Sequence, residues 1–140
     1  MIIEKKKTVC LILFIVYILI VLKLTIFRFA VNYDEPQLNL TFFTDLIYVY
    51  KNAGVIEFLR LFLGNIGWFI PFGFLLPMLL KKKSVLKVAI LGLVFSFSIE
   101  VSQFIFRKGI AELDDLVLNT LGAVIGYILY TIIINRGGGN

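Results

Sequence analysis

Residues 100–122, EVSQFIFRKGIAELDDLVLNTLG, place a group of polar and charged side chains between two of the most apolar runs of the chain. The group consists of Glu100, Gln103, Arg107, Asp114, Asp115 and Asn119. Ionisable groups within a membrane-spanning helix are costly, and they usually pair with one another or mark a site for a substrate or an ion. What these side chains do therefore depends on the apolar runs that flank them.

The composition is that of an integral membrane protein. Of the 140 residues, 60% are hydrophobic and only 16% are charged. A helix needs about 20 apolar residues to cross the hydrocarbon core, and four runs of that length fit into the chain. We predict an all-α membrane bundle in a single domain, residues 1–140, with spans at about residues 8–27, 59–80, 85–106 and 116–134.

The segment between the first two expected spans is too polar to cross the membrane. It carries Asp34, Glu35 and Asp45, together with aromatic residues such as Phe43 and Tyr48. Aromatic side chains favour the boundary between membrane and water. We therefore expect this segment to lie on the membrane surface or to dip shallowly into it.

Basic residues indicate how the spans are oriented. They cluster on one side of a four-span path, at Lys5, Lys6, Lys7, Lys81, Lys82, Lys83, Lys87 and Arg136. By the positive-inside rule, this side of the membrane and both termini are expected to be cytoplasmic. Arg60, Arg107 and Lys108 fall on the outer side against the rule. Because anchoring clusters account for the net charge of +5, we do not predict binding to nucleic acid.

The residue types that are scarce exclude several kinds of site. Cys10 is the single cysteine and histidine is absent, so the chain has neither the pair for an internal disulfide nor the ligands for a Cys/His zinc site. We expect no metal and no cofactor. Bulky residues, TIFRF, follow the first apolar run where a cleavage site would need small ones, so we expect an uncleaved first span.

Helical spacing arranges the polar side chains of the third expected span on one face. Glu100, Gln103 and Arg107 stand at positions i, i+3 and i+7, and Ser96 extends the same face one turn deeper. A polar stripe is therefore expected along the outer half of this span.

The fourth expected span carries a second stripe. Asp115 and Asn119 share a face with Gly122 and Gly126, and small residues of this kind let helices approach closely. Asp114 or Asp115 would also cap this helix by accepting hydrogen bonds from its free N–H groups. The two stripes can face each other.

The second expected span contains GNIGWFIPFGFLLP, in which Pro71 and Pro77 are expected to kink the helix. We assign Pro71 and Gly73 to helix packing. Asn65 shares a face with Trp68, so this amide is a further candidate for an outer cavity, as is Arg60.

Two interpretations of the polar stripes stay open. In the first, Arg107 pairs with Glu100 or Asp115 while Gln103 bonds Asn119, and the set locks the third and fourth spans together. In the second, the same groups line a site for a ligand or an ion, which is the usual role of ionisable residues inside spans.

Three stretches carry a family resemblance. QLNLTFF resembles an LNLxPF element in which Phe42 takes the place of the usual proline, and GNIGWFIPFGFLLP resembles an N-x-x-x-F-x-P-x-G-x-L-x-P helix. Residues 100–126 resemble the signature E-x-x-Q…D-D-x-x-x-N-x-x-G-x-x-x-G. Together they resemble the VanZ-like family of small bacterial membrane proteins, named for an accessory protein of teicoplanin resistance.

The resemblance implies that Glu100, Gln103, Asp115, Asn119 and Gly122 are functional positions. It implies a contribution to glycopeptide or lipoglycopeptide resistance, or to homeostasis of the cell envelope. Our leading hypothesis is an amphiphile, such as a membrane lipid, a lipid-linked envelope precursor or a lipoglycopeptide, bound in an outward polar cavity between the second, third and fourth spans.

Two alternatives belong to other functional classes. Glu100 could act as the general base of a membrane-embedded transferase for lipid-linked envelope precursors, or Glu100 and Asp115 could carry a proton or cation in a small transporter. We do not favour an enzyme, because the chain shows no recognisable nucleophile and Asp114 and Asp115 are neighbours on one segment.

Overall fold

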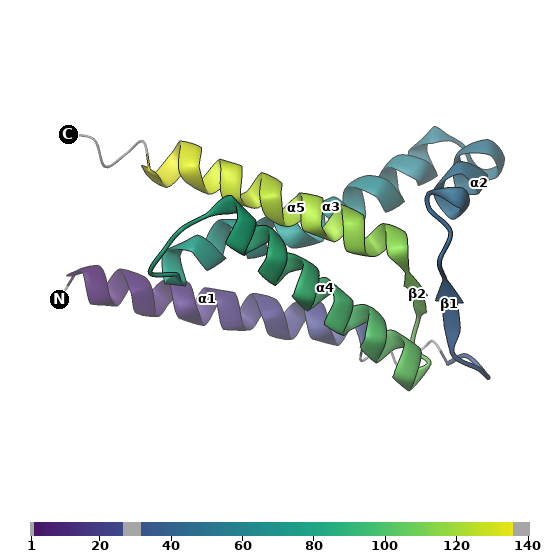
Figure 1. Cartoon of the computed structure of the whole chain (residues 1–140), viewed down its shortest axis with the longest axis horizontal. Coiled ribbons are helices and arrows are strands. Elements are labelled where there is room, and N and C mark those ends of the chain that lie inside the picture. The colour runs from purple at the N-terminus through teal and green to yellow at the C-terminus, as the bar shows by residue number, and fades with distance from the viewer. Residues whose placement is uncertain (1, 27–31, 136–140) are drawn as a thin grey trace.

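The structure is a computed structural model that describes residues 2–26 and 32–135. The elements follow in the order α1 (Ile2–Thr25), β1 (Gln37–Asn39), α2 (Thr44–Ala53), α3 (Val55–Leu79), α4 (Val85–Phe106), β2 (Ile110–Glu112), α5 (Leu113–Tyr130) and the π-helical turn η1 (Thr131–Asn135). Over these residues, four helices are long and apolar enough to cross a membrane. The predicted all-α membrane bundle is confirmed, with one very short sheet added to it (Figure 1).

The helix bounds differ from the expected spans mainly at their starts. α3 begins at Val55 and α5 at Leu113, a few residues before the expected 59 and 116, whereas α4 covers the residues expected of the third span. Helices extend past their apolar stretch because polar first turns tolerate water and headgroups. Residue 27, the expected end of the first span, and Arg136 lie outside the described residues.

α3 and α5 form the tightest helix contact. A methyl group added to any of three glycines would overlap the backbone of the facing helix, at distances of 1.8 Å from Gly73 to Ala123 O, 2.2 Å from Gly122 to Ile66 O and 2.1 Å from Gly126 to Ile70 O. The two backbones therefore meet with nothing between them, as small residues allow in membrane helices.

Pro71, which was assigned to helix packing, lies on an exposed face of α3. Its ring is exposed, whereas Pro77 is buried. Pro71 precedes Gly73 by two residues, and each residue of an α-helix turns the direction of the side chain by about 100°. The two residues therefore lie about 200° apart around the helix axis. Pro71 therefore faces away from α5.

The interior is aromatic and aliphatic, and so is most of the outer surface. The buried cluster that joins α1, α3, α4 and α5 consists of Val21, Phe69, Phe72, Leu76, Val88, Ile99 and Ala123. On the outside, Ile56 is 81% exposed and Ile105 62%. Apolar side chains on the outer surface of a helix bundle fit a lipid environment, where they cost nothing.

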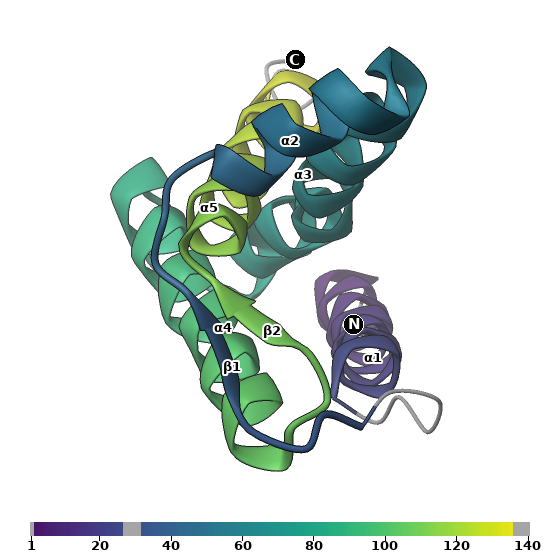
Figure 2. The same ribbon diagram turned by 90° about the vertical axis from the view of Figure 1, so that its right-hand side faces the viewer.

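The sheet was not predicted, and it changes the role of the polar segment before α2. β1 pairs with β2 in parallel, with Gln37 beside Ile110, Leu38 beside Ala111 and Asn39 beside Glu112. Figure 2 shows the two strands side by side across α4, with α2 following above them. The segment between the first two spans is thereby fastened to the connection between α4 and α5.

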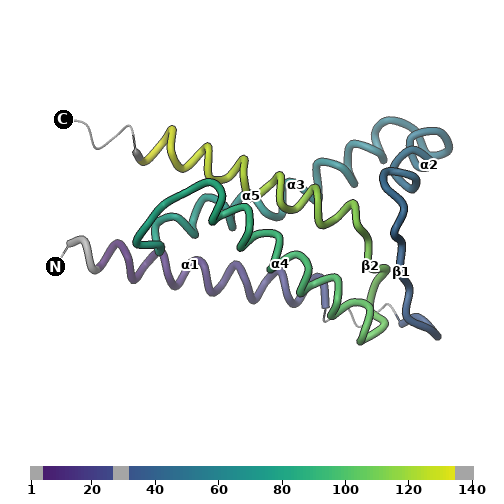
Figure 3. Tube along the Cα trace, viewed as in Figure 1, coloured from purple at the N-terminus to yellow at the C-terminus, as the bar shows by residue number. Residues whose placement is uncertain are grey.

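The bundle has two distinct ends. The start of α1, the turn at residues 81–84 and the end of α5 lie together at one end, and β1, β2 and α2 lie at the other (Figure 3). We refer to the second of these as the sheet end. The polar stretch that stood out in the sequence lies at the sheet end.

Candidate functional site

The polar side chains at the sheet end surround two cavities. The first cavity has a volume of about 420 Å³, and its polar lining consists of Tyr33, Asp45, Asn65, Gln103, Glu112, Asp114 and Asp115. The second has a volume of about 360 Å³, and its polar lining includes Thr25, Asn65, Trp68, Glu100, Gln103, Asp115 and Asn119. Three residues line both cavities and form their common wall: Asn65, Gln103 and Asp115.

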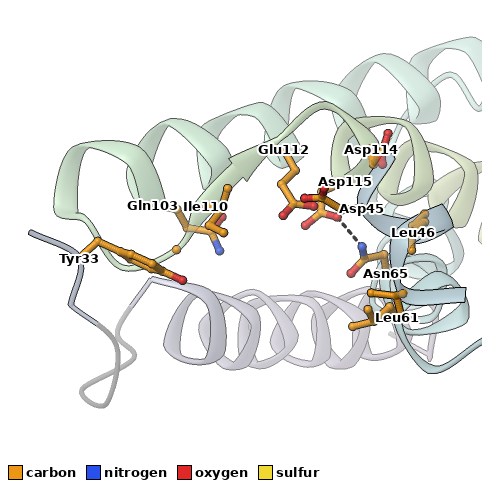
Figure 4. A pocket seen from close by; sticks show the side chains of 12 residues that line it. Tyr33, Asp45, Leu46, Leu61, Asn65, Gln103, Ile110, Glu112, Asp114 and Asp115 are labelled. Carbon is orange, nitrogen blue, oxygen red and sulfur yellow. Dashed lines mark hydrogen bonds between the residues drawn. The ribbon is translucent and has the colours of Figure 1, made fainter. Parts of the chain in front are cut away.

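Asn65 and Asp115 connect α3 to α5 at the common wall. The Asn65 side-chain amide donates a hydrogen bond to the Asp115 carboxylate (Figure 4). Asp115 lies in the first turn of α5, where a carboxylate is stabilised by the positive end of the helix dipole. The amide that was expected only to approach the cavity thus holds one of its carboxylates.

Glu100 joins α4 to β2. Its side chain is 5% exposed, and its Oε2 accepts a hydrogen bond of 3.0 Å from the backbone N–H of Glu112. A carboxylate that accepts a backbone N–H makes a stronger bond than a neutral acceptor does. Glu100 is therefore bonded to the backbone of β2. One interpretation of the sequence had paired it with the basic side chain of Arg107.

The expected bond between Gln103 and Asn119 does not form. Asn119 instead donates to the Ser96 hydroxyl at 2.9 Å, in a buried bond between α5 and α4. Asn119 lies one turn deeper than Asp115, and Ser96 one turn deeper than Glu100, so these two residues meet at the same level. Gln103 donates through Nε2 to the backbone carbonyl of Thr25 at 3.4 Å.

The expected pairing of Arg107 with Glu100 or Asp115 is also absent. Arg107 ends α4 in a left-handed conformation, with φ of 56°. Its guanidinium is exposed and donates to the backbone carbonyl of Asp34 at 2.7 Å. Because α4 ends at this residue, helical spacing no longer applies to it, and the side chain does not lie on the polar face shared by Glu100 and Gln103.

Arg60 does not reach the candidate site either. It forms an exposed ion pair with Glu57 one turn earlier on α3, and it lines neither cavity. Exposed pairs of this kind contribute little stability. Asn65, one turn further along α3, is the residue of this helix that does face the cavities.

Asp114 fastens α2 to the start of α5. Both oxygens of its buried carboxylate accept the backbone N–H of Phe43 at 2.9 Å. Phe43 precedes α2 in a left-handed conformation with φ of 54°, which an ordinary residue adopts only when its surroundings hold it there. Glu112 is the N-cap residue of α5, and its side chain makes no capping hydrogen bond.

Asp45 and Glu112 also line the first cavity, although neither was predicted to belong to the site. Glu112 is half-buried, and Asn39, its register partner in the sheet, donates to Asp45 at 2.8 Å. In Figure 4, Asp45, Glu112 and Asp115 point toward one another. Burial, and then the neighbouring charges of Asp115, Asp45 and Asp114, raise the pKa of Glu112 to about 7.

An apolar groove lies next to the two cavities. It has a volume of about 210 Å³ and is lined by Leu38, Leu40, Phe97, Glu100, Val101, Phe104, Ala111, Glu112, Leu113 and Leu116. Glu112 also lines the first cavity and Glu100 the second. A polar compartment and an apolar one therefore share these two residues.

The chemistry of the site is that of acceptors. The charged side chains that line the two cavities, among the described residues, are Asp and Glu, and an ionised carboxylate can accept hydrogen bonds but cannot donate them. Within residues 2–26 and 32–135, no group of three or more His, Cys, Asp or Glu side chains is arranged to hold a metal ion.

Comparison with known proteins places the chain in a family. The sequence profile of the VanZ/LLP1 family matches residues 14–134. Protein VanZ of Enterococcus faecium is 35% identical over 99 residues, which make up 71% of this chain and 55% of that protein. The chain thus spans about half the length of this curated relative. No solved structure gives a significant match. Because the profile covers most of its length, the chain belongs to the VanZ/LLP1 family of membrane proteins.

Proposed function

We propose that this protein binds an amphiphilic ligand at the sheet end of the bundle, and that binding contributes to teicoplanin-type resistance or to homeostasis of the cell envelope. One observation carries the proposal. The polar cavities and the apolar groove adjoin at Glu100 and Glu112, each of which lines the groove and one cavity. A ligand with a polar head and an apolar tail needs both kinds of lining within reach of each other.

The groove fits the tail of such a ligand. Leu38 and Leu40 from the β1 segment and Phe97 from α4 are each more than half exposed, so the groove opens at the surface of the bundle. Burying an apolar chain gains about 0.8 kcal/mol for each CH₂ group taken out of water. A tail that already lies in the bilayer gains less, and it enters the groove sideways without leaving an apolar environment.

We place the sheet end on the outside of a bacterial plasma membrane. Lys81, Lys82 and Lys83 stand in the turn at the opposite end, and the positive-inside rule assigns that turn to the cytoplasm. The ligand classes considered are a membrane lipid, a lipid-linked envelope precursor and a lipoglycopeptide, all of which are present at or reach the outer leaflet. The likeness to Protein VanZ, and the resemblance to a family named for an accessory protein of teicoplanin resistance, support the proposed link to resistance.

Susceptibility to a lipoglycopeptide tests the proposal. A susceptible strain that expresses the wild-type chain is expected to be protected, and Glu100→Gln, Asp115→Asn and Asn119→Ala are expected to remove most of the protection. Glu100→Gln and Asp115→Asn keep an acceptor oxygen but remove the charge, and Asn119→Ala removes a buried hydrogen bond. A hydrogen bond to a charged group is worth about 1.5 to 3 kcal/mol, so we expect a loss of roughly tenfold in affinity.

The matched control is Glu35→Gln, which removes one negative charge from an exposed position outside both cavities. Membrane insertion and amount of each variant are measured in parallel. If all three cavity variants insert normally and protect as well as wild type, the cavities have no part in resistance.

A further inference from the structure

We infer that the two cavities select a ligand whose head group is cationic and donates hydrogen bonds, as an ammonium group does, over one that carries an anionic phosphate or pyrophosphate. The inference rests on the proposed binding of an amphiphile at the sheet end and names the class of head group.

The first reason is the charge of the walls. Asp45, Glu112, Asp114 and Asp115 line the first cavity, and Glu100 and Asp115 line the second. Ionised carboxylates offer only acceptor oxygens. An ammonium group placed among them gains hydrogen bonds and Coulomb attraction, whereas a phosphate meets repulsion in surroundings that screen charge less than water does.

The second reason is independent of charge. Gln103 lines both cavities and is 5% exposed. Its Oε1 atom is buried and finds no hydrogen-bond partner among the described residues, while its Nε2 is directed to the backbone carbonyl of Thr25. A buried acceptor without a donor costs about 1 to 3 kcal/mol. A ligand that brings an N–H or O–H group to this wall would satisfy it.

The third reason is where the nearby basic side chains go. Arg60 pairs with Glu57 on the exposed side of α3, Arg107 donates to a backbone carbonyl, and Lys108 donates to an asparagine of the loop before β1 at 2.7 Å. Each of these three cations is thus engaged by a group that lines neither cavity. The raised pKa of Glu112, which its acidic neighbours help to cause, is in keeping with this.

Fluorescence of Trp68 provides a readout of the second cavity, which shares a wall with the first. Trp68 is the single tryptophan of the chain and lines the second cavity. Purified protein in phosphatidylcholine vesicles is titrated with dodecylammonium and, separately, with dodecyl phosphate, so that the two probes share one tail. We expect a saturable change with dodecylammonium and an apparent affinity at least tenfold higher than that for dodecyl phosphate.

Substitutions connect the signal to the proposed groups. Asp115→Asn, Glu112→Gln and Gln103→Leu are each expected to weaken dodecylammonium binding about tenfold, as the loss of one charge-assisted or buried bond would. Asp45→Asn, at an exposed position of α2, replaces a buried variant that fails to fold. It is likewise expected to weaken dodecylammonium binding, because Asp45 lines the first cavity. Glu35→Gln, outside both cavities, is expected to bind as wild type does.

The outcomes separate this inference from the proposal beneath it. Saturable dodecyl phosphate binding that equals or exceeds dodecylammonium binding, and that Gln103→Leu weakens, would overturn the cationic selectivity and leave amphiphile binding intact. Dodecylammonium binding that none of the cavity variants alters would overturn the assignment of its head group to these cavities. No saturable signal with either probe would overturn both.

Discussion

At the scale of single residues, Glu112 is the group whose charge state bears most on the site. Its carboxyl faces Asp45 of α2 and Asp114 and Asp115 of α5, it lies near Glu100 of α4, and its pKa of about 7 is set first by burial and then by its acidic neighbours. A cation bound among these groups favours the ionised form of Glu112, because opposite charges stabilise each other. Binding and the loss of this proton are therefore linked.

We predict that dodecylammonium binds more weakly as the pH falls below about 7. Below that value Glu112 is protonated in the free protein, so the cation must displace a proton in order to bind. For one linked proton the apparent affinity falls by up to about tenfold for each pH unit. Trp68 fluorescence titrations between neutral and mildly acidic pH measure the slope.

Glu112→Gln is the matched variant for this pH dependence. It is expected to flatten the slope near pH 7 while leaving a weaker affinity that changes little with pH. An affinity that rises as the pH falls, or an unchanged slope in Glu112→Gln, would show that another group governs the dependence.

Helical spacing predicted the polar residues that lie inside helices and failed where a helix ends. Glu100, Gln103 and Asn119 line the second cavity, on the faces where spacing placed them. Arg107 left its stripe because it adopts a left-handed conformation that ends α4. Glu112 was missed because it lies in a strand, where a helical repeat carries no information.

At the scale of elements, the contact between α3 and α5 depends on three glycines. Replacing Gly73 by alanine is predicted to destabilise the protein by about 1 to 3 kcal/mol or more, as overpacking does. The new methyl group would lie 1.8 Å from the backbone oxygen of Ala123, and backbone cannot move aside as a flexible side chain can. Unfolding in mixed detergent micelles measures the loss.

The same helix supplies the control. A methyl group added at Gly67 of α3 meets no atom within 4 Å, and alanine is the better helix former by about 1 kcal/mol. Gly67→Ala is therefore expected to leave stability unchanged or raised. Equal loss in both variants would mean that α3 tolerates no substitution at all, and that close approach to α5 is not the cause.

The strands are the elements that no local pattern could have predicted. β1 and β2 have three residues each, too few for the alternation of apolar and polar residues by which strands are recognised. Their parallel pairing joins two segments that α2, α3 and α4 separate in sequence. The membrane-spanning helices, by contrast, can be predicted from the length of their apolar runs.

At the scale of the whole molecule, the two ends of the bundle are predicted to lie on opposite sides of the membrane. Cysteine introduced as Asp34→Cys, at the sheet end, is expected to react with an impermeant thiol reagent in intact cells. Lys82→Cys, in the turn at the other end, is expected to react only after permeabilisation, because lysine clusters remain in the cytoplasm.

The native Cys10 is 5% exposed, so the unsubstituted chain provides a low background for this labelling. Both introduced positions are exposed in the structure, so a failure to label reports the side of the membrane and not burial. Labelling of Lys82→Cys in intact cells, with Asp34→Cys protected, would invert the orientation and place the cavities in the cytoplasm.

The parallel pairing of β1 with β2 also has a consequence for biosynthesis. When β1 leaves the ribosome, its partner has not yet been made, because three helices must be synthesised before β2. Only the entry of α5 into the bilayer brings the carboxylates of its first turn to the sheet end. A nascent chain halted before β2 would carry a first strand without a partner, and the cavities at the sheet end would form only after α5 had been made.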